Sequence, residues 1–285
     1  MQGTYNECPV SLRGGEILSV YGKTFNFNGQ SSDVFNLVLC DFDTPSPTKE
    51  TGLNLTINKG AIIPGRPLPN FYTAQYTDVL KFQMSFIKCD MEPFSQNEYR
   101  QVAQWLHSPA SYSLLYIEDD DTDDYHHEIE YFAKCTGLTE YGLTGTVYGF
   151  TATFECNAPY GFSPEEVTAF SSSTGRNAII SINNTSDETS QDYYPIVEIK
   201  CTSTGKVQIA NNKYSSEIFT LEMNLNQQLN IDNRLGIIED SLNLFDFSTD
   251  TNLNWLHLAP GINQITIIGN ATGNIRCRYP RKVGI

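Results

Sequence analysis

Most of this chain alternates apolar and polar residues with a period of two. In an extended strand successive side chains point to opposite faces, so such a segment turns one apolar face to a core and one polar face outward. The pattern therefore predicts a mainly β protein. Val38–Phe42 is more continuously apolar, which predicts a strand covered on both sides. The clearest alternating segments are Leu80–Phe86, Tyr148–Cys156, Val197–Cys201, Phe219–Leu225 and Ile275–Tyr279.

One segment departs from this period and predicts a helix. Ser95 and Glu98 form an S-x-x-E capping box, and Phe94 and Tyr99 occupy the two positions of a hydrophobic staple. The helix should end near His107, because a proline follows two residues later. A single helix among many strands predicts β-sandwich architecture with the helix packed on one sheet. Its apolar positions are Tyr99, Val102, Ala103 and Leu106.

Length and charge limit the classes of protein to consider. The 285 residues suggest two domains, and the 12% aromatic content argues against disorder. Acidic residues outnumber basic ones 33 to 18, giving a formal charge of −15, which disfavours unaided binding to a nucleic-acid backbone. No stretch approaches 18 consecutive apolar residues, so no membrane insertion is expected, and the first residues show no secretory signal.

Two stretches have the composition of arms or linkers. Thr44–Tyr76 holds five of the 13 prolines, which predicts an extended excursion outside the central sheets. Phe162–Tyr193 is rich in Ser, Thr and Asn and lacks a long apolar run. We therefore expect an N-terminal domain over residues 1–163, with an extended arm at 44–76, and a C-terminal β-sandwich domain over 164–285.

The seven cysteines include no C-x-x-C pair, so neither a metal ribbon nor a thioredoxin-like site is expected. Four of them, Cys40, Cys89, Cys156 and Cys277, lie in or beside apolar alternating runs. We expect small, buried, reduced residues. A nucleophilic thiol would need a partner base, and none of the four histidines lies in a recognisable signature.

The acidic run Glu118–Asp124 invites comparison with a calcium loop. Asp119, Asp121 and Asp123 occupy positions 1, 3 and 5 of an EF-hand, and Glu130 falls at position 12. Position 6 requires glycine but holds an aspartate, and both flanks have strand character. The favoured interpretation is a solvated acidic hairpin tip.

The remaining candidate residues also favour structural roles. His126 and His127 are adjacent, so on a strand they point to opposite faces and cannot chelate one ion together. Trp105 is expected to pack from the helix, and Trp255 to pack rather than to stack on a sugar. Arg276, Arg278, Arg281 and Lys282 form a basic end that either pairs with an acidic surface or is solvated. We assign no catalytic, cofactor-binding or metal-ligating residues and no cofactor, and leave the binding residues open.

Several local patterns, taken in order, resemble the distal tail protein family of bacteriophages with long non-contractile tails. FNFNGQSSD at Phe25–Asp33 is similar to the family's opening hairpin, with its Asn28-Gly29 turn, and VLCDFDT to its first core strand. The strand at Lys81–Phe86 and the helix ending in Trp-Leu match the family's next elements. Val147–Ser163 resembles the closing strand and exit of the N-terminal domain.

The C-terminal half of the chain also resembles this family. YPIVEIK and the segment Leu258–Pro280 are similar to strands of the family's C-terminal sandwich, with turns at Pro260-Gly261 and at Gly269–Gly273. The first 20 or so residues have no counterpart. The resemblance implies an N-terminal β-sandwich with one packed helix, and a C-terminal sandwich of the galectin-like or jelly-roll kind.

The function implied by the resemblance is structural. The family forms a hexameric ring at the end of the tail tube, made by the N-terminal domains, with the tube protein above and tail-tip or receptor-binding proteins below. The expected location is the virion's tail tip, after synthesis in the host bacterial cytoplasm, with DNA only as cargo through the channel. Two alternatives compete with this non-enzymatic hub: a carbohydrate-binding adhesin recognising a host cell-wall glycan, and a hydrolase acting on such a glycan.

Overall fold

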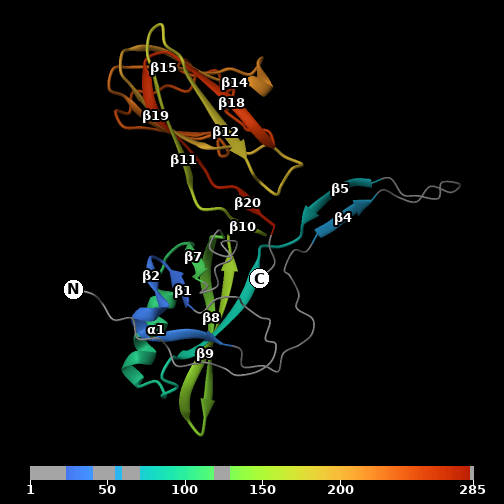
Figure 1. Cartoon of the computed structure of the whole chain (residues 1–285), viewed down its shortest axis with the longest axis vertical. Helices are drawn as coiled ribbons and strands as arrows, with labels where there is room; N and C mark the ends of the chain where they lie inside the picture. The colour runs from blue at the N-terminus through green and yellow to red at the C-terminus, as the bar shows by residue number, and fades with distance from the viewer. Residues whose placement is uncertain (1–23, 41–54, 60–70, 119–128, 283–285) are drawn as a thin grey trace, which may run out of the picture. The chain divides into compact units, whose positions relative to one another are not determined.

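The computed structural model describes residues 24–40, 55–59, 71–118 and 129–282 (Figure 1). The chain divides into two compact units. The first contains the described residues up to Phe162 together with Lys282, and the second is Ser163–Arg281. Each unit has its own hydrophobic core, and the two clusters share no residue.

The first unit is built on a seven-stranded antiparallel sheet of order β2-β1-β7-β8-β9-β6-β3. The Asn28-Gly29 turn joins its first two strands, and both residues have positive φ (54° and 75°), as a two-residue hairpin loop requires. A short 3₁₀ helix, Ser32–Phe35, follows. The strands are β1 (Thr24–Phe27), β2 (Gln30–Ser31), β3 (Leu37–Cys40), β6 (Lys81–Lys88), β7 (Ser113–Glu118), β8 (Tyr131–Leu143) and β9 (Thr146–Cys156).

This sheet folds over on itself to make two layers. Strands β1 and β6 stand four positions apart, which would be about 19 Å in a flat sheet. Yet the rings of Phe25 in β1 and Phe86 in β6 lie 5.8 Å apart, and Phe27 meets Phe154 of β9 at 5.4 Å. The expected sandwich packing is confirmed, with both layers belonging to one continuous sheet.

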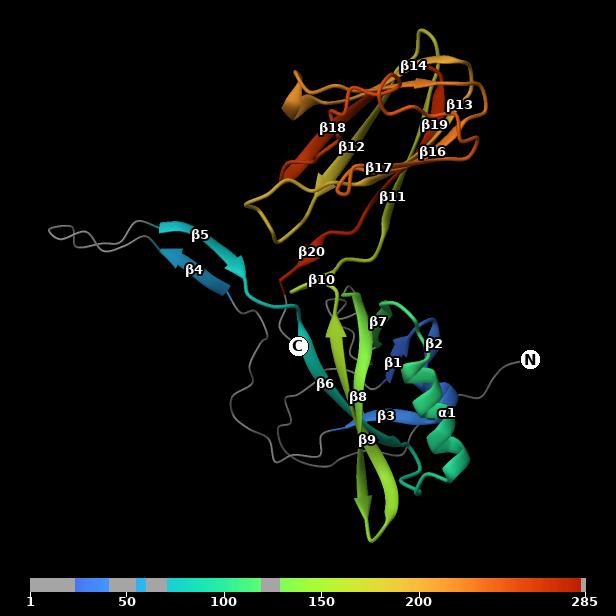
Figure 2. The same cartoon turned by 180° about the vertical axis from the view of Figure 1, so that it is seen from behind.

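The one α-helix among the described residues, α1 (Gln96–His107), closes this core (Figure 2). Ser95 caps it: the Glu98 backbone N–H donates to Ser95 Oγ, and the Ser95 N–H donates to the Glu98 carboxylate at 2.8 Å. Phe94 and Tyr99 both pack on the Phe150 ring. The predicted helix, capping box and end near His107 are confirmed.

A separate two-stranded sheet and one further short strand complete the first unit. Strands β4 (Leu55–Lys59) and β5 (Phe71–Tyr76) pair with each other in a two-stranded sheet of their own, inside the proline-rich stretch. Strand β10 (Gly161–Phe162) bridges to Glu130.

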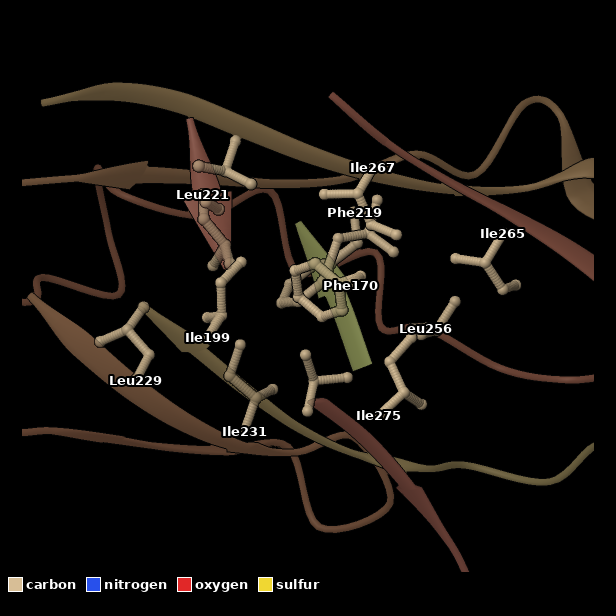
Figure 3. Packing of buried hydrophobic residues seen from close by; sticks show 14 of the residues in the cluster. Phe170, Ile199, Phe219, Leu221, Leu229, Ile231, Leu256, Ile265, Ile267 and Ile275 are labelled. Atoms are coloured by element: carbon tan, nitrogen blue, oxygen red, sulfur yellow. The ribbon is translucent and has the colours of Figure 1, made fainter. Parts of the chain in front are cut away.

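The second unit is a sandwich of two antiparallel sheets, which confirms the predicted C-terminal sandwich. One sheet has the order β11-β19-β13-β16-β17 and the other β12-β18-β14-β15. Figure 3 shows their inward side chains meeting, with Ile199, Ile231 and Ile275 from the first sheet and Phe219, Leu221, Ile265 and Ile267 from the second. The strands are β11 (Glu166–Ser172), β12 (Ala178–Asn184), β13 (Ile196–Cys201), β14 (Gly205–Asn211), β15 (Phe219–Met223), β16 (Gln228–Asp232), β17 (Ile237–Asp240), β18 (Gly261–Ile268) and β19 (Ala271–Cys277), with the 3₁₀ helix η3 (Asn212–Tyr214) and the short β20 (Pro280–Arg281).

Three expectations about local structure were wrong. The stretch Phe162–Tyr193 is no linker, because it supplies β11 and β12 as edge strands of the two sheets. The strand predicted at Val38–Phe42 is not covered on both sides: β3 is an edge strand with three half-exposed residues. The second C-terminal turn ends before Gly273, which lies inside β19.

Candidate functional site

The described residues contain no group of three His, Cys, Asp or Glu side chains arranged to hold a metal ion. No described helix is long and apolar enough to span a bilayer. The acidic run leaves β7 at Glu118 and the chain re-enters β8 at Tyr131, so the flanking helices of an EF-hand are replaced by strands. Residues 119–128, with His126 and His127, lie outside the described part of the chain.

Four cysteines are buried thiols: Cys135, Cys156, Cys201 and Cys277. Burial raises the pKa of Cys156 to about 12 and that of Cys277 to about 11, so both stay protonated near neutral pH and are poor nucleophiles.

Two other cysteines depart from the buried, reduced state that was expected. Cys40 is half-exposed at the end of the edge strand β3 and is not disulfide-bonded. Cys89 is disulfide-bonded. It lies in a turn directly after the end of β6 and is half-exposed.

Both tryptophans pack, as predicted. Trp105 is 8% exposed, stacks on Phe25 and Phe35, and donates its indole N–H to the Phe27 carbonyl at 3.0 Å. Trp255 packs at the margin of the second core, 5.6 Å from the Phe219 ring. Each indole ring therefore packs against residues of its own unit.

The basic end meets acids of its own unit. Arg276 contacts Glu198 at 2.5 Å and Glu165 at 2.7 Å, and Arg278 contacts Glu165 at 3.4 Å. Arg281 donates to the Thr185 carbonyl. Pairing with acids is therefore observed for Arg276 and Arg278, whereas Arg281 contacts Thr185.

A histidine cluster that sequence patterns did not reveal ties loops of the second unit together. His257 lies between two carboxylates, with Nδ1 2.8 Å from Asp192 and Nε2 3.0 Å from Glu217. Tyr214 donates to Asp192 at 2.7 Å, and its ring lies 4.1 Å from the imidazole. Burial and the Asp192 hydrogen bond raise the pKa of Tyr214 to about 12. These contacts tie together the loops that carry Asp192, Glu217 and His257.

A polar hollow of about 790 Å³ lies on the outer face of the five-stranded sheet. Strand alternation builds it: Val197, Ile199 and Cys201 face the core, so Glu198 and Lys200 face outward. Its outward polar lining comes from β13, β16, β19 and the end of β17: Glu198, Lys200, Gln228, Asn230, Glu239, Ser241, Thr272 and Asn274.

A second exposed feature is the tip of the β8–β9 hairpin (Figure 1). The two strands pair from Ala133↔Cys156 to Leu143↔Thr146, whereas β7 pairs with β8 only at Tyr131–Ala133. Beyond Gly149 the hairpin therefore leaves the sheet, ending in the Thr144-Gly145 turn with positive φ at both residues. Leu143 at the tip is 67% exposed.

The two domains match two models of phage tail proteins. Residues 20–158 match the phage tail protein N-terminal domain, and residues 160–277 match the phage tail C-terminal domain. No curated protein sequence matches the chain.

Solved structures with the same fold include proteins of two phages. The Dit protein (gp 19.1) of phage SPP1, described as a paradigm of the hub adsorption apparatus in phages infecting Gram-positive bacteria, is 13% identical. That likeness covers 90% of this chain and 98% of the SPP1 chain with a TM-score of 0.60. A chain of the phage P2 baseplate in its calcium-bound activated conformation is 12% identical over 90% of this chain and 98% of its own, with a TM-score of 0.51. The strontium-bound P2 baseplate gives 12% identity over 91% and 98%, with a TM-score of 0.50.

The two-unit β architecture and the two matched domains define a component of a phage tail. Within that class, the chain belongs to the phage tail protein family whose N-terminal and C-terminal domain models it matches, and it shares its fold with the SPP1 Dit protein.

Proposed function

We propose that this protein is the structural hub of a long non-contractile tail, a homohexameric ring that joins the tail tube to the tail-tip and host-adsorption proteins. The observation that carries the proposal is the family membership, together with a fold likeness to SPP1 Dit that spans 90% of the chain. The role is non-enzymatic. Its partners are further copies of itself, the tube protein and the tail-tip or receptor-binding proteins.

The hairpin tip supports assembly by the first unit. A two-stranded hairpin is only marginally stable in water by itself, and an uncovered strand edge is a template for pairing with another chain. From Lys134 to Leu143 the outer edge of β8 pairs with no other described strand, and the tip exposes Leu143. In a ring, each protomer would present this tip to a complementary patch on the next.

The proline-rich arm is the second proposed contact. In the described part of this stretch, β4 and β5 pair only with each other, which leaves their sheet available to a neighbour. We propose that the arm, residues 44–76, embraces the adjacent protomer. Deletion of residues 45–69 should then give soluble monomers, and hexamers that persist after the deletion would exclude this contact.

The acidic balance suits a channel that DNA crosses. With a formal charge of −15 per chain, a lumen lined by acids would repel phosphates and let the genome slide through. An electrostatic map of the assembled ring tests this idea, since a neutral or positive bore would refute it.

The hub itself is tested by location and stoichiometry. Gold-labelled antibodies raised against the pure chain should mark the tail tip in electron micrographs of virions. Native mass spectrometry of the protein, alone or with its tail partners, should find six copies of the 32.0 kDa chain. Negative-stain averages should show six-fold rings. Label along the tail shaft, or absence from the virion, would rule out the hub.

A second role, adhesion to a host cell-wall glycan, is favoured by one observation. The polar hollow of the second unit has the volume of a small-molecule site. Adhesion predicts that residues 164–285 bind whole host cells. It is compatible with the hub, because different units would perform the two tasks.

A further inference from the structure

We propose that the hollow on the five-stranded sheet binds an oligosaccharide through Lys200, Gln228, Thr272 and Asn274. This proposal deepens the adhesion role and does not depend on the hexameric ring. It rests on a comparison of the polar side chains of the hollow that already make hydrogen bonds or ion pairs within the unit with those that make none there.

Strand register aligns these side chains in two rows. Lys200 stands opposite Thr272 of β19 and Gln228 of β16, and directly opposed residues in an antiparallel pair project to the same face. Glu198 is flanked in the same way by Asn274 and Asn230. Amide, hydroxyl and ammonium groups therefore run across neighbouring strands on the floor of one hollow.

The acids of the hollow are already engaged. Glu198 accepts from Arg276, and Glu239 accepts from the Asn230 amide at 3.1 Å. Asp240 accepts the backbone N–H groups of Leu242 at 3.0 Å and Phe245 at 3.0 Å. Their hydrogen-bonding capacity serves the fold of the unit.

Four other polar side chains of the hollow, three from the Lys200 row and Asn274 from the Glu198 row, remain available to a ligand. The side chains of Lys200, Gln228, Thr272 and Asn274 have no hydrogen-bond partner among the residues that the structure describes. Two amides and a hydroxyl can each donate and accept, and the ammonium donates three hydrogens. A ligand that matches this set must offer many groups that also both donate and accept.

Sugar hydroxyls have that property, and the alternatives fit less well. The apolar residues of the lining, Phe170, Ile199 and Leu229, are buried beneath the sheet, so an apolar peptide would find no exposed anchor. A nucleic acid would meet Glu198 and Glu239 on an acidic protein. The one unengaged charge is the Lys200 ammonium, which favours a glycan with an acidic substituent over one with a basic substituent.

The test uses the full-length chain on an array of neutral and acidic oligosaccharides, followed by calorimetry with the strongest ligand. We expect saturable binding with one site per chain. Lys200→Ala and Gln228→Ala should each weaken binding about tenfold, the effect of losing a hydrogen bond to a bound ligand. The matched controls are Lys206→Ala and Gln208→Ala, on the outward face of β14 in the other sheet.

Two checks make the result decisive. Circular dichroism and melting temperature should be the same for all four variants and the wild type, because the substituted side chains lie outside the core. The proposal is overturned if the wild-type chain retains no oligosaccharide. It is equally overturned if binding survives unchanged in both hollow variants, or if the controls lose it to the same extent. A hollow that proves to be covered by a tail protein and binds no glycan would refute it while leaving the hub intact.

Discussion

At the scale of single residues, Gly273 is the position where packing leaves no room for a side chain. It lies in β19, and a Cβ atom there would overlap the Glu198 carbonyl oxygen and come within 2.8 Å of the Phe170 ring. The carbonyl belongs to the paired strand β13 and cannot move without breaking the ladder. Gly273→Ala should therefore destabilise the second unit by roughly 3 kcal/mol, the upper range for overpacking.

Urea unfolding of the full chain measures this effect, with Gly137→Ala as the matched control. Gly137 also lies in a strand, but a Cβ there would stop 3.7 Å from Thr153, an ordinary contact. The control should change stability by less than about 1 kcal/mol. Similar losses in the two variants would show that the close approach at Gly273 does not govern stability.

Glu98 provides a pH-dependent contribution at the start of α1. Hydrogen bonds from Ser95, then the Lys88 ammonium at 3.2 Å, lower the pKa of this carboxyl to about 2. Because the folded pKa lies below the unfolded value, the stabilisation is present above about pH 4.3 and is lost as pH falls toward 2.

Replacing Glu98 with Gln should cost about 1 kcal/mol at pH 7, the size of a helix cap. The difference in melting temperature between Glu98→Gln and the wild type should narrow steadily between pH 4.5 and pH 3. Glu92→Gln, an exposed change just before the helix, is the control for general charge effects. A difference in melting temperature that stays constant over this pH range would contradict the stabilising role of the Glu98 carboxylate.

At the scale of secondary-structure elements, sequence patterns predicted an element correctly where its signal lies within a short stretch of the chain. The capping box, the staple and the apolar face of α1 lie within 14 consecutive residues, so the helix could be placed from sequence. Strands β11 and β12 gave a weak signal because they are edge strands. Val167 and Ile179 are exposed, whereas Ser172 and Asn184 take buried positions that usually hold apolar residues, so polarity does not follow exposure along these strands. Their pairing partners lie about 100 and 80 residues away, which no local pattern reports.

The hollow was invisible in the sequence for a related reason. The polar side chains that we propose bind the ligand come from residues 200, 228, 272 and 274. Only the order of the strands in the sheet brings them together. The same holds for His257, whose partners Asp192 and Glu217 lie 65 and 40 positions away. Alternation predicted which side chains face outward, but not which strands are neighbours.

The β8–β9 hairpin gives a prediction at this scale. Leu143→Asp places a charge at the exposed tip, where it should change the stability of the isolated chain by less than about 0.5 kcal/mol. If the tip docks on the next protomer, burying that charge is costly, and the variant should be excluded from rings and from purified tails.

Ile179→Asp is the matched control, since Ile179 is 63% exposed on a strand of the second unit. Native mass spectrometry and immunoblots of purified tails provide the readout. Normal incorporation of Leu143→Asp would remove the hairpin from the proposed ring contact.

At the scale of the whole molecule, the two cores are built from different residues. The first cluster runs from Phe25 to Cys156 and the second from Phe170 to Tyr279. We therefore predict that a fragment of residues 163–281 folds without the first unit. Its amides in β13 and β19 should be as protected from hydrogen exchange as in the full chain, and a fragment with rapid exchange throughout would contradict this independence.

The charge of the whole chain leads to the last prediction. Duplex DNA is held by proteins mainly through phosphate contacts with Lys and Arg, and this chain has 18 such residues against 33 acids. In the described second unit, Arg276 and Arg278 are already paired with Glu165 and Glu198. The excess of acids, with the net charge of −15, therefore repels phosphate.

We expect the full-length protein to leave the mobility of linear duplex DNA unchanged even at about 10 mM salt, where screening is weakest and any attraction would be strongest. A basic protein of similar mass serves as the positive control in the same gel. Retardation of the DNA that disappears on adding salt would reveal a phosphate-binding surface. That result would contradict the proposal of a channel whose charge repels DNA.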